Sequence, residues 1–247
     1  MIKIVRARDY QDMSRKAANI ISAQVILKPN SILGLATGES PIGTYQQLIE
    51  WNKKGDVDFS QVHTYNLDEY YGIAEDDPQS YRYFMNKYFF NDINIDIANT
   101  HVPAGSNLDV EDACSSFDKM VADAGFCDLQ LLGIGRNGHI GFNEPAEAFS
   151  KGTFCVDLTP STIEANSRLF EREEDVPRRA YTMGVQTIMN ARSILVVANG
   201  DKKAQAVYDM CFGPVTPKCP ASILQLHTNV TLVADEEALA LCKDKLD

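Results

Sequence analysis

The fold and the chemistry of this chain are best read from one run of residues near its middle, Leu131-Leu132-Gly133-Ile134-Gly135-Arg136-Asn137-Gly138-His139-Ile140-Gly141-Phe142-Asn143-Glu144-Pro145. The run begins as an apolar strand and ends in a turn that is rich in glycine. That turn holds one histidine, one carboxylate and two asparagines within eight residues, a density that suits proton transfer. We therefore expect a catalytic site at the end of a buried strand.

Strand-like and helix-like segments alternate along the rest of the chain. Short apolar, β-branched runs are separated by longer segments in which apolar residues recur with the helical period. This alternation predicts right-handed βαβ crossovers and a three-layer, mainly parallel, Rossmann-like α/β sheet with helices on both faces. Because no internal repeat or flexible linker interrupts it, we expect a single domain over residues 1–247. The expected strands are 2–5, 31–36, 62–66, 128–132, 153–157, 193–198 and 230–234, and the expected helices are 10–27, 41–54, 80–88, 110–124, 202–212 and 236–245.

Ligands bind at the carboxyl ends of strands in such sheets, and several of the expected strand ends carry polar side chains. Besides the run around His139, they are residues 37–41, 66–70 and 199–203. In the first of them, Ser40 and Pro41 predict a helix start with Ser40 as the N-cap. Free backbone N–H groups at such a start suit a phosphate, although most Ser-Pro helix starts bind nothing.

The spacing Gly133-x-Gly135-x-x-Gly138 formally matches the dinucleotide-binding fingerprint, and Asp157 lies about 20 residues further on. A dinucleotide site needs a full helix directly after the glycines. Later glycines and Pro145 interrupt the segment and leave little room for one. We therefore expect these glycines to let a substrate approach the backbone closely.

His139 differs from the other histidines of the chain, because Glu144 follows it in the same short turn. The Glu144 carboxylate can accept the ring N–H, which fixes the tautomer and raises the basicity of the ring. His63, His101 and His227 have no partner at ligand spacing, so we expect structural roles for them.

Asp68 and Glu69 end a strand in mostly apolar company. In one interpretation an acid at this place is a helix cap or a solvated side chain at the rim of the sheet. In the other, Asp68 points into a cleft, where desolvation raises its pKa toward the range that is useful to a general base.

Composition excludes several function classes. The chain has 247 residues and a formal net charge of -11, which argues against a nucleic-acid groove or an anionic membrane surface as partner. An anionic small substrate is still compatible, because a few local cations dominate one pocket when remote charges are screened. No signal peptide and no apolar run of membrane-spanning length is seen, so we expect a cytoplasmic protein.

The cysteines give no sign of a metal site or of disulfides. Six are scattered along the chain, with no C-x-x-C pair and no histidine at zinc spacing. We expect buried free thiols and no metal.

Taken together, four motifs closely resemble those of the glucosamine-6-phosphate deaminase family, in the same order and over essentially the whole chain. Gly-His-Ile-Gly-Phe-Asn-Glu-Pro is highly specific to that family. The resemblance implies an isomerising hydrolase of C–N bonds that turns D-glucosamine 6-phosphate and water into D-fructose 6-phosphate and ammonia, in N-acetylglucosamine catabolism and without a cofactor. The motifs are Leu35-Ala36-Thr37-Gly38 with Ser40-Pro41, Asn66-Leu67-Asp68-Glu69-Tyr70, the run from Gly133 to Pro145, and Ala165-Asn166-Ser167-Arg168.

The resemblance also implies roles by motif position. Asp68 would move a proton from C2 to C1 of the open-chain sugar through an enolamine. His139, assisted by Asn137 and Glu144, would open the pyranose ring. A mobile lid around residues 158–182 would close over the substrate and exclude water. The phosphate would be held by Thr37, Gly38, Ser40, Arg168 and Lys203.

Two features depart from the family pattern. Asn137 stands where many members have Asp, so a neutral partner orients His139, and we expect retained activity with a modestly shifted pH profile. Phe154 and Val156 stand where allosteric members have cations that help to bind N-acetylglucosamine 6-phosphate, and the chain ends soon after Lys245, without their longer tail. We expect allosteric activation to be lost and the associated hexamer to be dispensable, which leaves monomer or homo-oligomer open.

Two other functions compete with this interpretation. A 6-phosphogluconolactonase shares the expected fold and hydrolyses a phosphorylated sugar lactone. A regulator that binds a sugar phosphate without chemistry is the second alternative. Release of ammonia from glucosamine 6-phosphate separates the deaminase from both.

Overall fold

A sheet of seven strands forms the centre of the molecule, in the order β1-β10-β9-β6-β2-β3-β5. The computed structural model describes residues 2–159, 163, 172 and 175–245. Every pairing between neighbours in this sheet is parallel, as the alternation of strands and helices predicts. The strands are β1 (Lys3–Ala7), β2 (Ile32–Leu35), β3 (His63–Asn66), β5 (Thr100–His101), β6 (Leu129–Gly133), β9 (Ile194–Ala198) and β10 (Val230–Asp235).

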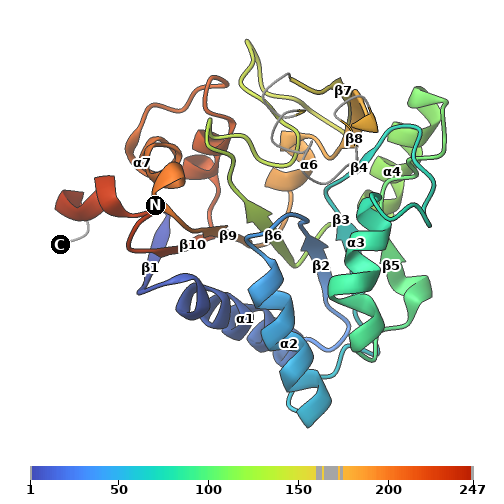
Figure 1. Cartoon of the computed structure of the whole chain (residues 1–247), viewed down its shortest axis with the longest axis horizontal. Coiled ribbons are helices and arrows are strands. Elements are labelled where there is room, and N and C mark those ends of the chain that lie inside the picture. Colours follow the sequence, from blue (N-terminus) through green and yellow to red (C-terminus); the bar gives the residue numbers. More distant parts are fainter. Residues whose placement is uncertain (1, 160–162, 164–171, 173–174, 246–247) are drawn as a thin grey trace.

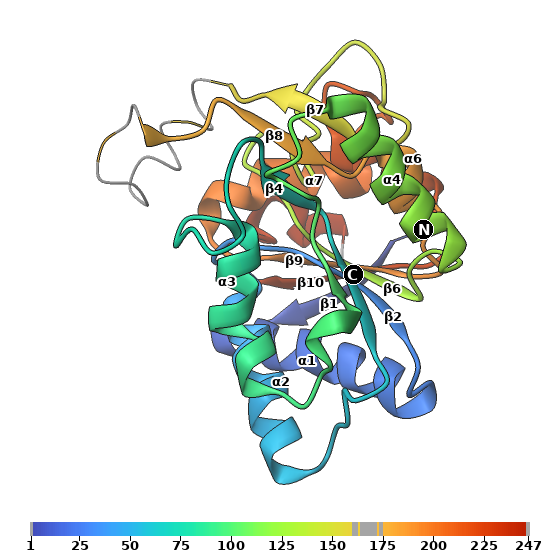
Figure 2. The same ribbon diagram turned by 90° about the vertical axis from the view of Figure 1, so that its right-hand side faces the viewer.

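Helices cover both faces of the sheet, which confirms the three-layer α/β fold (Figures 1 and 2). α1 and α2 pack on one face, together with α3, and α6 and α7 lie on the other face. All five residues of β9, an interior strand of the sheet, are buried, as a strand covered on both faces requires. The α-helices are α1 (Tyr10–Leu27), α2 (Ile42–Lys54), α3 (Tyr81–Tyr88), α4 (Val110–Asp123), α6 (Val185–Met189) and α7 (Ala204–Phe212).

A second, antiparallel sheet lies over the carboxyl ends of the parallel strands (Figure 2). Its strands, in spatial order, are β4 (Asp68–Tyr70), β8 (Arg179–Thr182) and β7 (Phe154–Asp157). The sequence analysis expected a strand at 153–157, but as part of the main alternation, and it missed β4, β8 and β5, the edge strand of the central sheet. All three missed strands have only two to four residues, which is too short for a periodic pattern to show.

Two local predictions are wrong. Residues 236–245 do not form an α-helix: the chain turns after β10 and forms a 3-10 helix over Ala240–Lys245, a short segment of the kind in which 3-10 geometry is common. Ser40 is not the N-cap of α2, because its hydroxyl donates to Asn199 Oδ1 at 2.7 Å. Pro41 takes the cap position, without a side-chain hydrogen bond, and the helix begins at Ile42.

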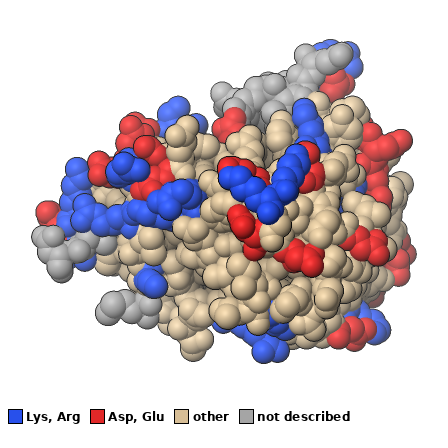
Figure 3. Space-filling model, turned by 90° about the horizontal axis from the view of Figure 1, so that it is seen from below, with Lys and Arg blue, Asp and Glu red and all other residues tan. Residues whose placement is uncertain are grey.

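The surface over α1 and α2 mixes the two signs of charge. Figure 3 shows Lys and Arg side chains beside Asp and Glu on this side of the molecule. Asp12 pairs with both Arg15 and Lys16 on α1, and Lys54 pairs with Glu50 on α2. Cations that are paired in this way are less available to a polyanionic partner.

Candidate active site

Four strand ends meet at one edge of the central sheet. β9, β6, β2 and β3 are neighbours in that order, and all run in the same direction. The segments that follow them are therefore side by side, although they lie far apart in the sequence. They carry, in the same order, Lys203, the loop with His139, the turn at 37–41, and Asp68.

His139 is held by a hydrogen-bonded set within its own loop. Its Nδ1 lies 2.7 Å from Asn137 Oδ1 and 3.4 Å from Glu144 Oε1. Asn137 Nδ2 donates to Glu144 Oε2 at 2.6 Å, so the amide links the ring to the carboxylate. Because the Asn137 oxygen can only accept, Nδ1 carries the proton in this arrangement. Nε2 is then the ring atom that is left for a substrate.

Two glycines allow this arrangement. A Cβ on Gly135 would lie 2.2 Å from His139 Nδ1, so the imidazole occupies the space of a side chain at 135. Gly141 has φ +56°, and a Cβ there would lie 2.9 Å from Thr182 Oγ1 and 3.5 Å from Asp68 Oδ2. The loop that carries His139 therefore passes directly beside the Asp68 carboxylate.

Asp68 is a buried acid. It is the first residue of β4, pairs with Thr182 of β8, and is 6% exposed. Within the described part of the chain, no hydrogen bond or ion pair involves its side chain. Burial, with a smaller contribution from the charge of Glu69, raises the pKa of Asp68 to about 8. A carboxyl with such a pKa exchanges protons near neutral pH, which suits a general base.

Glu69 holds α3 in place beside Asp68. Its carboxylate accepts the backbone N–H groups of Tyr70, Tyr81 and Arg82, each at 2.9 Å. Tyr81 and Arg82 open α3, so Glu69 satisfies donors that the helix leaves unpaired. Burial raises the pKa of Glu69 to about 7 against the effect of these bonds. The sequence analysis assigned no role to this residue, although the pair Asp68-Glu69 marked the place.

The turn after β2 presents free backbone donors. Within the described residues, the N–H groups of Thr37, Gly38 and Ser40 donate no hydrogen bond. The next helical N–H groups are engaged: Ile42 N donates to Glu39 O, and Gly43 N donates to the Tyr10 hydroxyl. An anion at this turn would thus accept hydrogen bonds from the backbone N–H groups of the turn and not from the first N–H groups of α2.

Lys203 lies beside this turn, at the start of α7. Its ammonium group donates to Ile134 O at 2.7 Å, at the end of β6. Burial and the charge of Arg136 lower the pKa of Lys203, and the charge of Glu39 raises it. Asn199, which binds Ser40, ties the turn after β9 to the turn after β2. The sequence analysis missed Asn199, because a link between distant loops leaves no local pattern.

Two predictions cannot be located. Arg168 lies outside the described residues, as does most of the segment 158–182, so the lid stays a prediction. The end of that segment, Arg179–Thr182, is strand β8.

Among the described residues, no group of three His, Cys, Asp or Glu could hold a metal ion. No described helix is long and apolar enough to cross a membrane.

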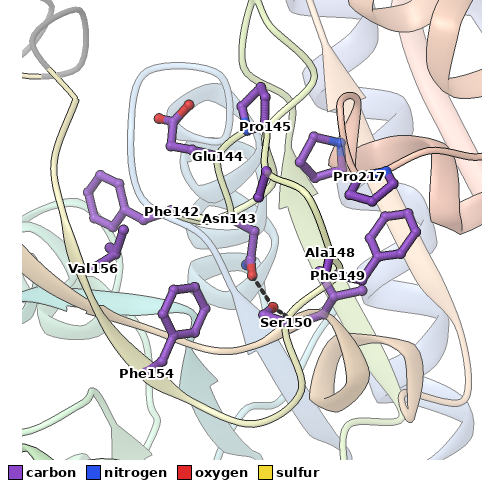
Figure 4. A pocket seen from close by; sticks show the side chains of 13 residues that line it. Phe142, Asn143, Glu144, Pro145, Ala148, Phe149, Ser150, Phe154, Val156 and Pro217 are labelled. Carbon is purple, nitrogen blue, oxygen red and sulfur yellow. Dashed lines mark hydrogen bonds between the residues drawn. The ribbon is translucent and has the colours of Figure 1, made fainter.

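An apolar pocket of about 300 Å³ lies next to Glu144. Figure 4 shows Phe142, Phe154 and Val156 on one side of it and Phe149 on the other. Phe154 and Val156, the two positions expected to carry cations in allosteric members, thus face an apolar cavity. Among the residues that the structure describes, no Lys or Arg lines it.

Known proteins resemble this chain over nearly its whole length. The family model described as glucosamine-6-phosphate isomerases/6-phosphogluconolactonase matches residues 8–233. A glucosamine-6-phosphate deaminase of Lachnoclostridium phytofermentans is 56% identical and covers 94% of this chain and 98% of its own. One of Halothermothrix orenii is 50% identical, with 97% and 100% covered.

Solved structures agree with these sequences. The structure of a monomeric glucosamine-6-phosphate deaminase has a TM-score of 0.94 at 42% identity and covers 97% of this chain and 100% of that one. A 6-phosphogluconolactonase from Thermotoga maritima has a TM-score of 0.71 at 19% identity, with 95% and 99% covered. That second likeness shows a shared fold only.

Proposed function

The chain belongs to the glucosamine-6-phosphate isomerase/6-phosphogluconolactonase family, and we propose that it is a glucosamine-6-phosphate deaminase. It converts D-glucosamine 6-phosphate and water to D-fructose 6-phosphate and ammonia, as an isomerising enzyme that cleaves a C–N bond. The relatives at 56% and 50% identity carry this name. The observation that supports it best is the buried carboxylate of Asp68, which has no partner among the described residues and lies beside the loop that positions His139.

The ring must open before a proton can leave C2. His139 acts in this step: Nε2 exchanges a proton with the ring and anomeric oxygens of the pyranose. Its Nδ1–H stays bonded to Asn137, which is bonded in turn to Glu144. A positive charge that develops on the His139 imidazole is stabilised by the nearby Glu144 carboxylate.

Asp68 then carries out the isomerisation. Its carboxylate takes the proton from C2 while the aldehyde oxygen at C1 takes a proton from the substrate's ammonium group, which leaves an enolamine with a C1–C2 double bond. The Asp68 carboxyl then returns its proton to C1. The product is an imine at C2. Water adds to that carbon, and the C–N bond breaks. Ammonia departs, and the remaining product is the ketone fructose 6-phosphate. One base serves both transfers because C1 and C2 are adjacent on one face of the substrate.

The phosphate end of the substrate is held at the turn of Thr37, Gly38 and Ser40 and by Lys203, with Arg168 as a further cation. This grip is remote from the reacting carbons, and its binding energy fixes them against Asp68. A charge of -11 on the whole chain is compatible with such a site, since the nearest cations dominate it. The phosphorylated substrate suits a cytoplasmic enzyme.

The direct test is a coupled assay of the purified chain. With glucosamine 6-phosphate as substrate, we expect ammonia and fructose 6-phosphate in equal amounts. 6-Phosphogluconolactone and glucosamine without the phosphate are the controls, and neither should turn over comparably. Hydrolysis of the lactone without release of ammonia from the amino sugar would contradict the proposal.

We also propose that N-acetylglucosamine 6-phosphate does not activate this enzyme. Its sugar phosphate would need cations, and Phe154 and Val156 face an apolar pocket instead. We expect the substrate concentration at half-maximal rate to be the same with and without the compound. A clear drop in that concentration, measured from full rate curves, would show that an activator site exists elsewhere.

A further inference from the structure

Asn66 is a buried amide without hydrogen bonds. It ends β3 and is 0% exposed, and neither Nδ2 nor Oδ1 has a partner in the described part of the molecule. A buried polar group that is left unpaired lowers the stability of the fold, because it has lost its bonds to water without replacement. A side chain of this kind at the carboxyl end of a strand, beside a catalytic site, calls for a functional explanation.

Asn66 lies next to Asp68. Only Leu67 separates the two residues, and its N–H donates to Leu35 O, so β2 accompanies the chain up to this point. In the sheet, Asn66 pairs with Leu35, the last residue of β2. The carbonyl of the next residue, Ala36, accepts a hydrogen bond from the Tyr45 hydroxyl. The charge of Asp68 raises the pKa of that hydroxyl. Asn66 and Asp68 are therefore both buried residues of one short segment that runs beside the end of β2. Two residues of extended chain span about 6–7 Å, within reach of two side chains of this length.

We propose that Asn66 is a positioning residue for Asp68, whose carboxylate accepts a hydrogen bond from Asn66 Nδ2 when it is charged. The inference rests on the proposed function, in which the charged form takes the C2 proton. An amide donor stabilises a carboxylate more than a carboxylic acid, because the bond is charge-assisted. Since the Asn66 amide has no other partner in the described structure, a rotation of the side chain breaks no existing bond.

Other titratable groups surround Asp68, and they are the same in every variant considered. β8 contributes the uncharged Thr182 at this place. A difference in titration between variants therefore reports the changed residue. Among the described residues, the titratable groups that interact with Asp68 are Glu69 from β4, Tyr45 from α2 and Tyr81 from α3. The loop whose Gly141 lies beside Asp68 also carries His139 and Glu144.

The test replaces Asn66 with Leu, which keeps the approximate volume and removes the donor. Thr64→Val is the matched control: the Thr64 hydroxyl, on β3 and two residues further from Asp68, is also buried and has no partner in the part of the chain that the structure describes. Two quantities are measured for each protein, the pH dependence of kcat/KM and the titration of the Asp68 carboxyl carbon by NMR. The NMR signal of that carbon is assigned as the carboxyl signal that is absent from the spectrum of Asp68→Asn.

For Asn66→Leu we expect the pKa of Asp68 to rise by about one unit, which lowers kcat/KM on the acidic limb about tenfold. At pH 5, where Asp68 is protonated and the amide has no partner in the described structure, stability to urea should be equal to or above that of the parent, because an unpaired amide is removed. Thr64→Val should leave both titrations unchanged. If Asn66→Leu does not fold, Asn66→Ala carries the same expectation.

An unchanged pKa of Asp68 in the Asn66 variant, or an equal shift in Thr64→Val, would overturn the inference. The NMR titration does not depend on turnover. If the parent releases no ammonia, the proposed function fails, while the titration still decides whether Asn66 controls the charge of Asp68.

Discussion

Asp68→Asn is expected to lower kcat by about 10⁴-fold, at the upper end of what a general base contributes. The amide keeps the shape of the side chain but cannot take a proton, and both transfers of the proposed reaction pass through this atom. KM should change little, since the phosphate contacts remain. The measurement is steady-state release of ammonia, with exchange of the C2 proton against solvent deuterium followed by NMR.

The same variant should be more stable than the parent at alkaline pH. In the folded chain the pKa of Asp68 is raised from 3.8 to about 8 by burial. Between these values the folded state holds a proton that the unfolded chain has lost, so this group lowers stability as pH rises through that window. Asn does not titrate. The gain in Asp68→Asn should be absent below pH 4 and reach the order of a few kcal/mol at pH 8.

A loss of kcat together with a gain in stability at alkaline pH separates a catalytic acid from a structural one. A carboxylate that supports the fold would lose stability when it is replaced. Urea unfolding at pH 4 and pH 8 tests the sign, and Asp56→Asn, at an exposed residue just after the end of α2 that is remote from the turn at 37–41, is the control that should change neither stability nor turnover much. Turnover of Asp68→Asn within a few-fold of the parent would mean that another group is the base.

Most of the central sheet could be predicted from the sequence because short apolar runs recur between longer helical segments, whereas its two-residue edge strand β5 left no pattern. The five apolar residues of β9 are identified as a strand by their short length, their β-branched side chains and the Asn-Gly turn that follows them. The small sheet could not, because β4 and β8 are short and pair across more than 100 residues of sequence, as Asp68 does with Thr182. Their pairing is decided by the tertiary fold.

The candidate site divides in the same way. His139, Asn137 and Glu144 lie within one loop, so a local motif was enough to bring them together. Asp68 could be named from its own motif, but its burial depends on strands and helices from elsewhere. The contact of Ser40 with Asn199 spans 159 positions, and the sequence instead suggested a helix cap for that serine.

Replacing His139 with Gln is expected to have the second large effect on kcat. We expect kcat to fall about 10²-fold, at the lower end for general acid–base catalysis, because sugar rings also open slowly without a catalyst. Gln can still donate or accept a hydrogen bond but cannot move a proton at neutral pH. The effect should be measured with the pyranose as substrate over the full range of pH.

His63→Gln is the matched control, since His63 begins β3 at the opposite end of the strand from Asn66 and Asp68. It removes an imidazole from the chain without touching the site, and it should leave kcat unchanged. If ring opening limits His139→Gln, its rate no longer depends on how fast the C2 proton leaves. Substrate deuterated at C2 should then turn over as fast as ordinary substrate. A full isotope effect in this variant would place His139 in the carbon-bound proton transfer instead.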